Sequence, residues 1–201
     1  MSRSRSSVRH PVRGSIVTLA IAALATGAAV AVPAQASPLV ERSVARSTSC
    51  PTGWGSLPEA SSKRSAATVR NVRTGRHACY DRLVIDLAGK RATGYRVYYV
   101  KTVTADGSGA PVRTRGGAAL QIVVNAQAYD AAGRPTYRMK NQRELSSVAG
   151  YDTFRQVAWG GSFEGQTTLA LGVRARLPFQ THVLTGPGNT TRLVIDVAHH
   201  W

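Results

Sequence analysis

The segment TGRHACYDR, residues Thr74–Arg82, places a histidine, a cysteine and an acidic residue within nine positions. His77 and Cys79 are the residue types of a nucleophile and its base, because a thiol needs a neighbouring proton acceptor to become reactive. Cys79 has Cys50 as its one possible disulfide partner in this chain. An oxidised cysteine has no thiolate with which to attack a substrate. The pattern therefore favours a turn that leads into a core strand carrying a disulfide at its start.

Ser162 in WGGSFEG, residues Trp159–Gly165, has a partial serine-elbow frame. That motif needs glycine at both ends of a five-residue frame, and Glu164 stands at the second position. The glycines instead predict a tightly turned hairpin. Trp159 and Phe163 are then candidates for an aromatic platform that binds a sugar ring, the alternative being that both side chains fill the core. Glu164 lacks a second carboxylate at a recognisable spacing, so a glycosidase pair is not supported.

Basic residues provide a second candidate binding surface. Arg174 and Arg176 alternate with apolar residues in GVRARLPF, which predicts that both lie on one face of a strand. Bidentate guanidinium contacts suit carboxylates and phosphates. The positions expected to join them are Arg155, Arg138 and Lys140. The alternative is an ordinary solvated face of an arginine-rich protein.

The sequence supports neither catalysis nor metal binding. His199 and His200 are adjacent, so on a strand their side chains point to opposite faces and do not share a metal ion. With the cysteine and serine motifs set aside, the sequence predicts no catalytic residue, no metal site and no cofactor.

The elements that position these side chains include an unusual repeat. DRLVIDLAG at Asp81–Gly89 and TRLVIDVAH at Thr191–His199 are nearly the same. Strand alternation puts Leu83, Ile85 and Leu87 of the first copy on one face, and the second copy repeats the pattern with Leu193, Ile195 and Val197. The repeat thus predicts two core strands from two related halves. Each repeated aspartate has an arginine four residues before it, which favours surface ion pairs over a catalytic carboxylate pair.

Short apolar segments alternate with turn signals from Cys50 onward, such as TADGSGAP, DAAGRP and TGPGNT. This spacing is typical of an all-β protein, an antiparallel β-sandwich of about eight strands in a single domain. The expected strands are Thr68–Val72, Tyr80–Leu87, Tyr95–Val103, Ala119–Ala128, Thr153–Trp159, Thr167–Ala175, Phe179–Leu184 and Arg192–Ala198.

The first 36 residues have the three parts of a secretory signal peptide. Four arginines precede an uncharged run from Ile16 to Val32, and Ala34-Gln35-Ala36 provides a cleavage site before Ser37. The run is short for a retained membrane anchor, which is the alternative. Residues 37–49 read as a flexible tether. The sequence thus predicts a secreted, wall-associated protein without a stable transmembrane anchor.

Export decides how the charges and cysteines are interpreted. Removing the four leader arginines leaves 22 basic against ten acidic residues, a formal charge of +12. Such a charge favours contact with polyanions of the envelope, whereas no motif supports nucleic-acid binding. Two cysteines in an oxidising compartment predict one disulfide, Cys50–Cys79, and two separate thiols are the alternative.

Five blocks of the chain are similar to the AMIN-like domain family, secreted actinobacterial relatives of the AMIN domain. They are CPTGWGS (Cys50–Ser56), VRTGRHACYDRLVIDLAG (Val72–Gly89), GGAALQIVV (Gly116–Val124), FRQVAWGGSFEGQTTLALGVRARLPF (Phe154–Phe179) and TRLVIDVAH (Thr191–His199). The resemblance implies a non-catalytic β-sandwich that binds the cell envelope through peptidoglycan or an attached anionic glycan. The alternative is a module that docks onto a secreted envelope protein.

Overall fold

The computed structural model describes residues 49–63, 66–89 and 93–201. Within these ranges the chain forms eleven strands and no helix. The strands are β1 (Glu59–Ser61), β2 (Thr68–Arg76), β3 (Tyr80–Ala88), β4 (Tyr95–Val100), β5 (Val103–Thr104), β6 (Pro111–Val112), β7 (Ala118–Val124), β8 (Phe154–Phe163), β9 (Gln166–Val173), β10 (Phe179–Thr185) and β11 (Thr190–Ala198). The expected signal peptide and nearly all of the expected tether lie outside the described residues.

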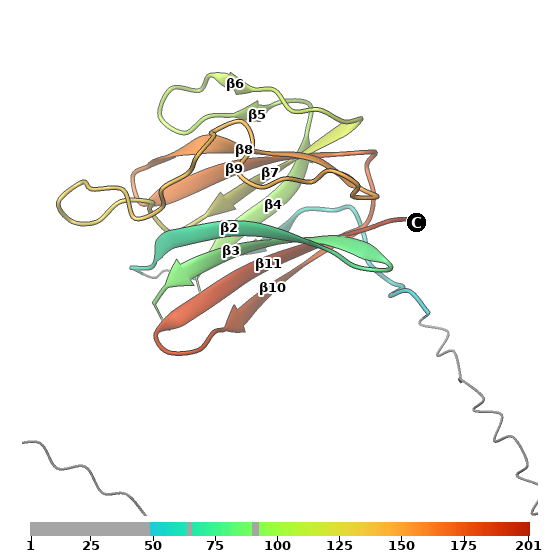
Figure 1. Cartoon of the computed structure of the whole chain (residues 1–201), viewed down its shortest axis with the longest axis horizontal. Coiled ribbons are helices and arrows are strands. Elements are labelled where there is room, and N and C mark those ends of the chain that lie inside the picture. The colour runs from blue at the N-terminus through green and yellow to red at the C-terminus, as the bar shows by residue number, and fades with distance from the viewer. Residues whose placement is uncertain (1–48, 64–65, 90–92) are drawn as a thin grey trace, which may run out of the picture. The chain divides into compact units, whose positions relative to one another are not determined.

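Two antiparallel sheets face one another across the core (Figure 1). One has the order β1-β4-β7-β9-β8 and the other β10-β11-β3-β2. The small β5–β6 hairpin lies on the outer side of the five-stranded sheet (Figure 1). The predicted all-β antiparallel sandwich is confirmed, and every expected strand overlaps an observed one. The expected strand Tyr95–Val103 is interrupted, because the chain bends at Lys101 and Thr102 between β4 and β5.

The two RLVID copies lie next to each other in the four-stranded sheet. β3 and β11 pair in antiparallel register with Val84 opposite Val194, the same position of the two copies. The pair therefore has a local two-fold relation, and each copy is flanked by its own hairpin partner, β2 or β10.

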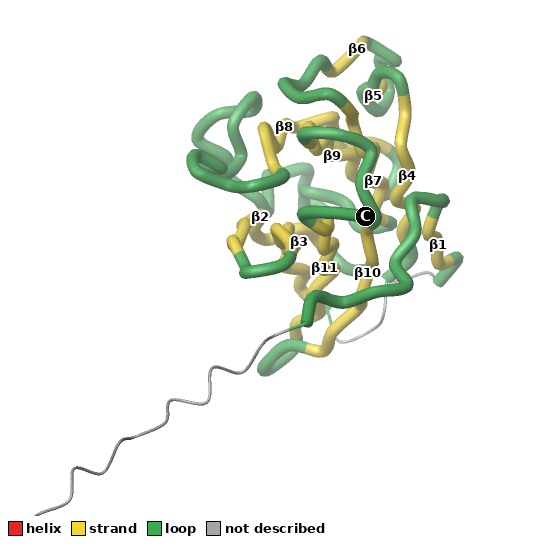
Figure 2. Tube along the Cα trace, turned by 90° about the vertical axis from the view of Figure 1, so that its right-hand side faces the viewer, coloured by secondary structure: helices red, strands yellow, loops and turns green. Residues whose placement is uncertain are grey.

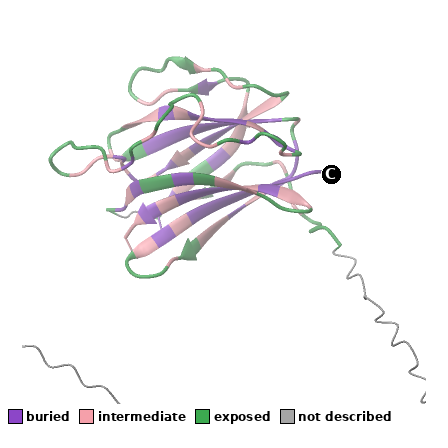
Figure 3. Cartoon of the chain, viewed as in Figure 1, coloured by how far each residue is buried: buried purple, intermediate pink, exposed green. Residues whose placement is uncertain are grey.

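The inward faces of β3 and β11 are buried as expected. Leucine, isoleucine and valine from both copies have no exposed surface, namely Leu83, Ile85, Leu87, Leu193, Ile195 and Val197. They join one core with residues of the facing sheet, and buried residues concentrate between the sheets in Figure 3. Each such side chain contributes about 1.5–3 kcal/mol of burial free energy before conformational entropy is counted.

Ion pairs on the outer face run across strands rather than along them. Arg82 of β3 binds Asp196 of β11, and Arg73 of β2 binds Asp86 of β3. Both aspartates therefore form ion pairs as expected, but each partner arginine comes from a neighbouring strand and not from four positions earlier in the chain. Neighbouring strands lie about 5 Å apart, closer than two same-face residues four positions apart on one strand.

The β5–β6 hairpin packs closely on the five-stranded sheet. Val103, Ala158 and Ala170 form a second small core beneath it. The segment after β6 also lies close to this sheet, because a Cβ at Gly172 of β9 would collide with the carbonyl oxygen of Arg115. The outer face of this sheet is thus partly covered, which determines where open grooves remain.

Candidate functional site

Four segments meet at the end of the sandwich where the C-terminus lies between the sheets (Figure 2). They are the start of β3, the residues just before β8, the connection after β9 and the segment after β11. Their polar side chains include Asp81, Asp152, Arg174 and His199. Because these residues are up to 118 positions apart, only the fold brings them together.

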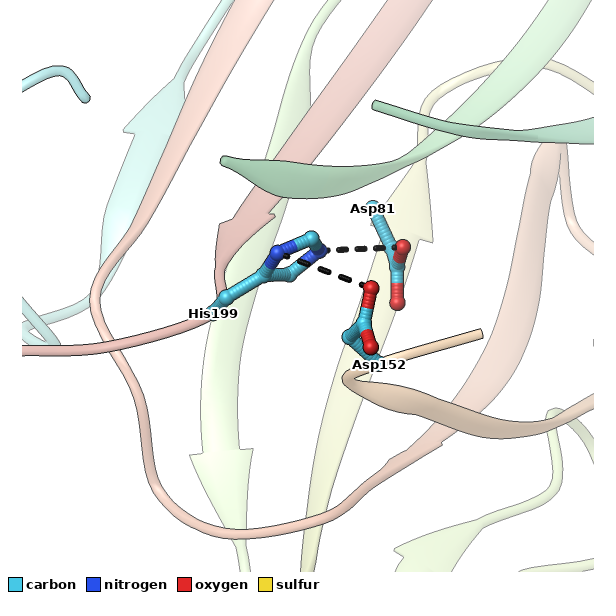
Figure 4. Close-up of side chains that lie close together, drawn as sticks. All are labelled: Asp81, Asp152 and His199. Carbon is cyan, nitrogen blue, oxygen red and sulfur yellow. Dashed lines mark hydrogen bonds and ion pairs between the residues drawn. The ribbon is translucent and has the colours of Figure 1, made fainter. Parts of the chain in front are cut away.

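Asp81 is fully buried and connects three of these segments. Its Oδ2 accepts hydrogen bonds from the backbone N–H of Thr153 at 2.6 Å and of Phe154 at 2.9 Å. Its Oδ1 lies 3.2 Å from Nε2 of the buried His199 (Figure 4). A buried carboxylate must be compensated by such donors. Asp81 therefore fastens the start of β8 and the end of β11 to β3.

Asp152 stands on the open side of the same imidazole. Its Oδ2 lies 3.8 Å from Nδ1 of His199 and accepts a 3.0 Å hydrogen bond from Nε of Arg76 (Figure 4). The hydrogen bond from Arg76 is the main cause of a lowered pKa of Asp152, and the charges of His199 and Arg155 act in the same direction. Asp152 therefore stays ionised at neutral pH.

Hydrogen bonds within the protein engage most of the ligand atoms that this cluster offers. Asp81, Asp152 and His199 each offer an atom within 4.8 Å of the others. Both oxygens of Asp81 are already hydrogen-bonded, however, and Oδ2 of Asp152 accepts a hydrogen bond from Arg76. Nε2 of His199 is hydrogen-bonded to Asp81, and Nδ1 lies 3.8 Å from Oδ2 of Asp152. The arrangement is best explained as a structural network.

The structure separates the predicted basic residues. Arg174 and Arg176 follow the last residue of β9, Val173, so they do not lie on a strand face as expected. Arg174 donates to the carbonyl oxygen of His199, and Arg176 donates to Ser56. Arg155 donates to three backbone carbonyls close to its own position in the chain. These side chains line three different hollows rather than one surface.

Trp159 and Phe163 are likewise not brought together. Trp159 packs against the main core, with its ring 5.9 Å from that of Tyr137. Phe163 is half exposed at the far end of β8, beside Gly107 of the β5–β6 connection, where a Cβ would lie 3.4 Å from its ring. Glu164 is exposed in the predicted tight turn, where it and Gly165 both have positive φ. The two aromatic rings therefore do not form one platform.

The predicted disulfide is present. Cys50 and Cys79 are bonded, with their Cα atoms 5.3 Å apart, which fits normal disulfide geometry. The bond holds the segment before β1 against the turn that leads into β3. Cys79 is therefore not a free nucleophile. It lies, as expected, in a disulfide at the turn that leads into a core strand.

Another hollow is a basic groove, for which sequence reasoning found Arg176 but missed Lys101 and Arg113. It has a volume of about 590 Å³ and lies where β4 leads into β5 and β6 leads into β7. Lys101, Arg113 and Arg176 line it, and no lining residue is acidic. Among the ion pairs of the described residues, none involves these three cations. We call these residues, with Tyr99, the basic groove.

A sequence signal for the basic groove existed. Lys101 and Arg113 stand on either side of TADGSGAP, whose composition predicts a turn. The β5–β6 hairpin that this turn closes brings its two flanks together. Arg176 reaches the groove from the connection after β9, and its guanidinium lies 5.1 Å from the centroid of the Tyr99 ring.

An all-β sandwich with a buried charge network and an open cationic groove has the features of a binding module. The family model of the AMIN-like domain matches residues 67–199, and the chain belongs to this family. No curated protein and no solved structure matches the chain. AMIN-like domains are generally non-catalytic, extracytoplasmic modules related to the cell envelope. Within the described ranges, no helix has the length and apolar character needed to cross a membrane.

Proposed function

We propose that this protein is exported, loses its first 36 residues and binds the cell envelope without catalysis. Its ligand is peptidoglycan or an anionic glycan attached to it, and the basic groove makes the main contact. The leader sequence and the disulfide support export. Family membership supports an envelope-related role.

The single observation that carries the proposal is the unpaired positive charge of the basic groove. Lys101 and Arg113 are exposed, and together with Arg176 they surround an open hollow that contains no carboxylate. Elsewhere in the described residues, arginine neutralises most of the acidic side chains, as at Asp86, Asp130, Asp152 and Asp196. The excess positive charge of the chain is therefore not compensated in this groove.

The chemistry of these cations matches an envelope polyanion. Guanidinium groups contact carboxylates and phosphates in a bidentate manner, whereas lysine acts as a flexible point charge. A groove open at its surface accepts a segment of a long polymer. A cluster of positive charges without nearby negative ones also raises the local concentration of an anionic ligand.

Retention on purified sacculi tests the proposal. We expect the mature protein to sediment with sacculi at physiological salt, and the double variant Lys101→Glu/Arg113→Glu to lose at least ten-fold in affinity. The matched control is Lys140→Glu/Arg143→Glu, which makes the same change of net charge at exposed positions outside the groove. Equal loss in both variants would show that net charge alone matters. Capture of a protein instead of glycan in cross-linked cells would favour the docking alternative.

A further inference from the structure

A second hollow lies beside the disulfide, between the segment before β1 and the end of the chain. Its volume is about 190 Å³. Two tryptophans line it together with the disulfide and neighbouring residues, including Trp54, Trp201, Cys50, Cys79, Pro178 and His200. We call it the indole cleft. None of its lining residues is acidic.

Both indoles are held in place from outside the cleft. The ring of Trp54 packs at 5.6 Å from the ring of Tyr80, and Tyr80 in turn stacks on His77 at 4.6 Å. Trp201 donates a 3.1 Å hydrogen bond from Nε1 to the carbonyl oxygen of Arg176. Trp201 nevertheless remains 76% exposed. Its indole is therefore oriented but not covered, which is a common feature of aromatic residues in binding sites.

The size of the indole cleft limits the ligand to one ring. A cavity of about 150 Å³ is enough for a benzene molecule, while drug-sized ligands need about 300–1,000 Å³. A volume of 190 Å³ therefore suits a single six-membered ring. A longer polymer would place one of its units in the cleft and continue over the surface.

The geometry points to a pyranose ring as that unit, so we propose that the indole cleft is a sugar subsite of the envelope glycan. The axial C–H groups of a pyranose form an apolar, weakly positive face that complements the negative face of an indole. This proposal rests on the proposed function and adds a position for the sugar. The two sites are neighbours, because Arg176 lines the basic groove and its backbone holds Trp201.

The charges around the cleft argue against its main rival, an aromatic cage for a quaternary ammonium group. Such cages attract a cation to the ring faces. Among the described residues, no acidic side chain lines the cleft to compensate the charge of an ammonium group. A neutral sugar ring needs no such compensation.

Indole NMR signals provide a direct test with a neutral probe, the N-acetylglucosamine tetramer. The chain has three tryptophans, and Trp159 packs against the core away from the cleft, so its Nε1–H signal is an internal reference. We expect the tetramer to shift the signals of Trp54 and Trp201 and to leave that of Trp159 unchanged. Trp201→Ala should weaken tetramer binding at least ten-fold, and the exposed aromatic control Phe163→Ala should not.

The outcomes separate this inference from the proposed function. Retention on sacculi without a shift of the Trp54 and Trp201 signals by the tetramer would overturn the sugar subsite alone. A shift by the tetramer without retention on sacculi would support the subsite and overturn the envelope proposal. A shift by choline but not by the tetramer would also overturn the subsite, since it would assign the cleft to an ammonium group.

Discussion

Arg82 and Asp196 join the two RLVID copies through two parallel hydrogen bonds of 2.7 Å each. Asp196 is almost completely buried, whereas Arg82 is about one-third exposed. The symmetry-related residues, Asp86 and Arg192, also face each other in the register, but Arg73 binds Asp86 instead. The Nε atom of Arg192 is buried and has no hydrogen-bond partner among the described residues. The local two-fold relation therefore holds for the backbone and the core but not for the ion pairs.

This asymmetry predicts unequal effects of two similar substitutions. Arg82→Met leaves the buried carboxylate of Asp196 without its partner, and we expect a loss of about 2–3 kcal/mol in the free energy of unfolding. Arg73→Met removes a more exposed pair and should cost at most about 1 kcal/mol. Urea denaturation of both variants measures the difference. Equal losses would mean that burial of Asp196 does not control the strength of the pair.

The disulfide should contribute a large part of the stability of this small domain. Cys50 and Cys79 are 29 residues apart, and a closed loop of this length stabilises by about 3–4 kcal/mol in the chain-entropy model. We expect the free energy of unfolding of the double variant Cys50→Ala/Cys79→Ala, measured by urea denaturation, to be lower by that amount. A reducing agent should lower the midpoint of the parent protein to that of the variant and leave the variant unchanged. A parent midpoint unaffected by complete reduction would contradict this account.

The sequence predicted those elements that carry a regular pattern. Alternation in RLVID was enough to assign the inward faces of β3 and β11, and all six predicted core residues are buried. The strands that were missed, β1 and β6, have three and two residues, too few to show any period. Their position is determined by pairing with distant segments.

Irregular backbone explains why the candidate binding residues were misplaced. Simple alternation puts Trp159 and Phe163 on one face of β8, but the strand has a bulge between Trp159 and Gly161. A bulge adds one residue, so the side chains after it change face. Similarly, β9 ends at Val173, so Arg174 and Arg176 lie outside the strand and alternation does not determine where their side chains point. The network of Asp81, Asp152 and His199 has no local sequence pattern at all.

The contact between Asp152 and Arg76 predicts acid sensitivity. The pKa of Asp152 is lowered from 3.8 in the folded protein, mainly by the hydrogen bond from Arg76. A lowered pKa contributes stability above the unfolded value, and that contribution disappears as the pH falls through the folded value. We expect Asp152→Asn to be less stable than the parent at pH 7 and to approach it below about pH 4. Thermal unfolding across this range checks the trend, and a constant difference would refute it.

Asp106 on the β5–β6 connection predicts the opposite dependence. The pKa of Asp106 is raised, mainly because the carboxyl group is partly buried. Its Oδ1 accepts a hydrogen bond from Thr168, whereas its buried Oδ2 has no hydrogen-bond partner among the described residues. Because the pKa of Asp106 is higher in the folded than in the unfolded protein, this group contributes its full stabilisation below the unfolded pKa of 3.8. That stabilisation is lost as the pH rises through the folded pKa.

Asp106→Asn removes the partly buried charge and keeps an oxygen that can accept from Thr168. We therefore expect this variant to be more stable than the parent at pH 7, by at most about 1 kcal/mol after solvent screening is counted. The advantage should vanish near pH 3.5, where the parent carboxyl is also neutral. Denaturation at the two pH values measures it, and Thr168→Val is the companion variant that removes only the hydrogen bond. A variant less stable than the parent at pH 7 would show that the carboxylate is better solvated than its partly buried position on the β5–β6 connection indicates.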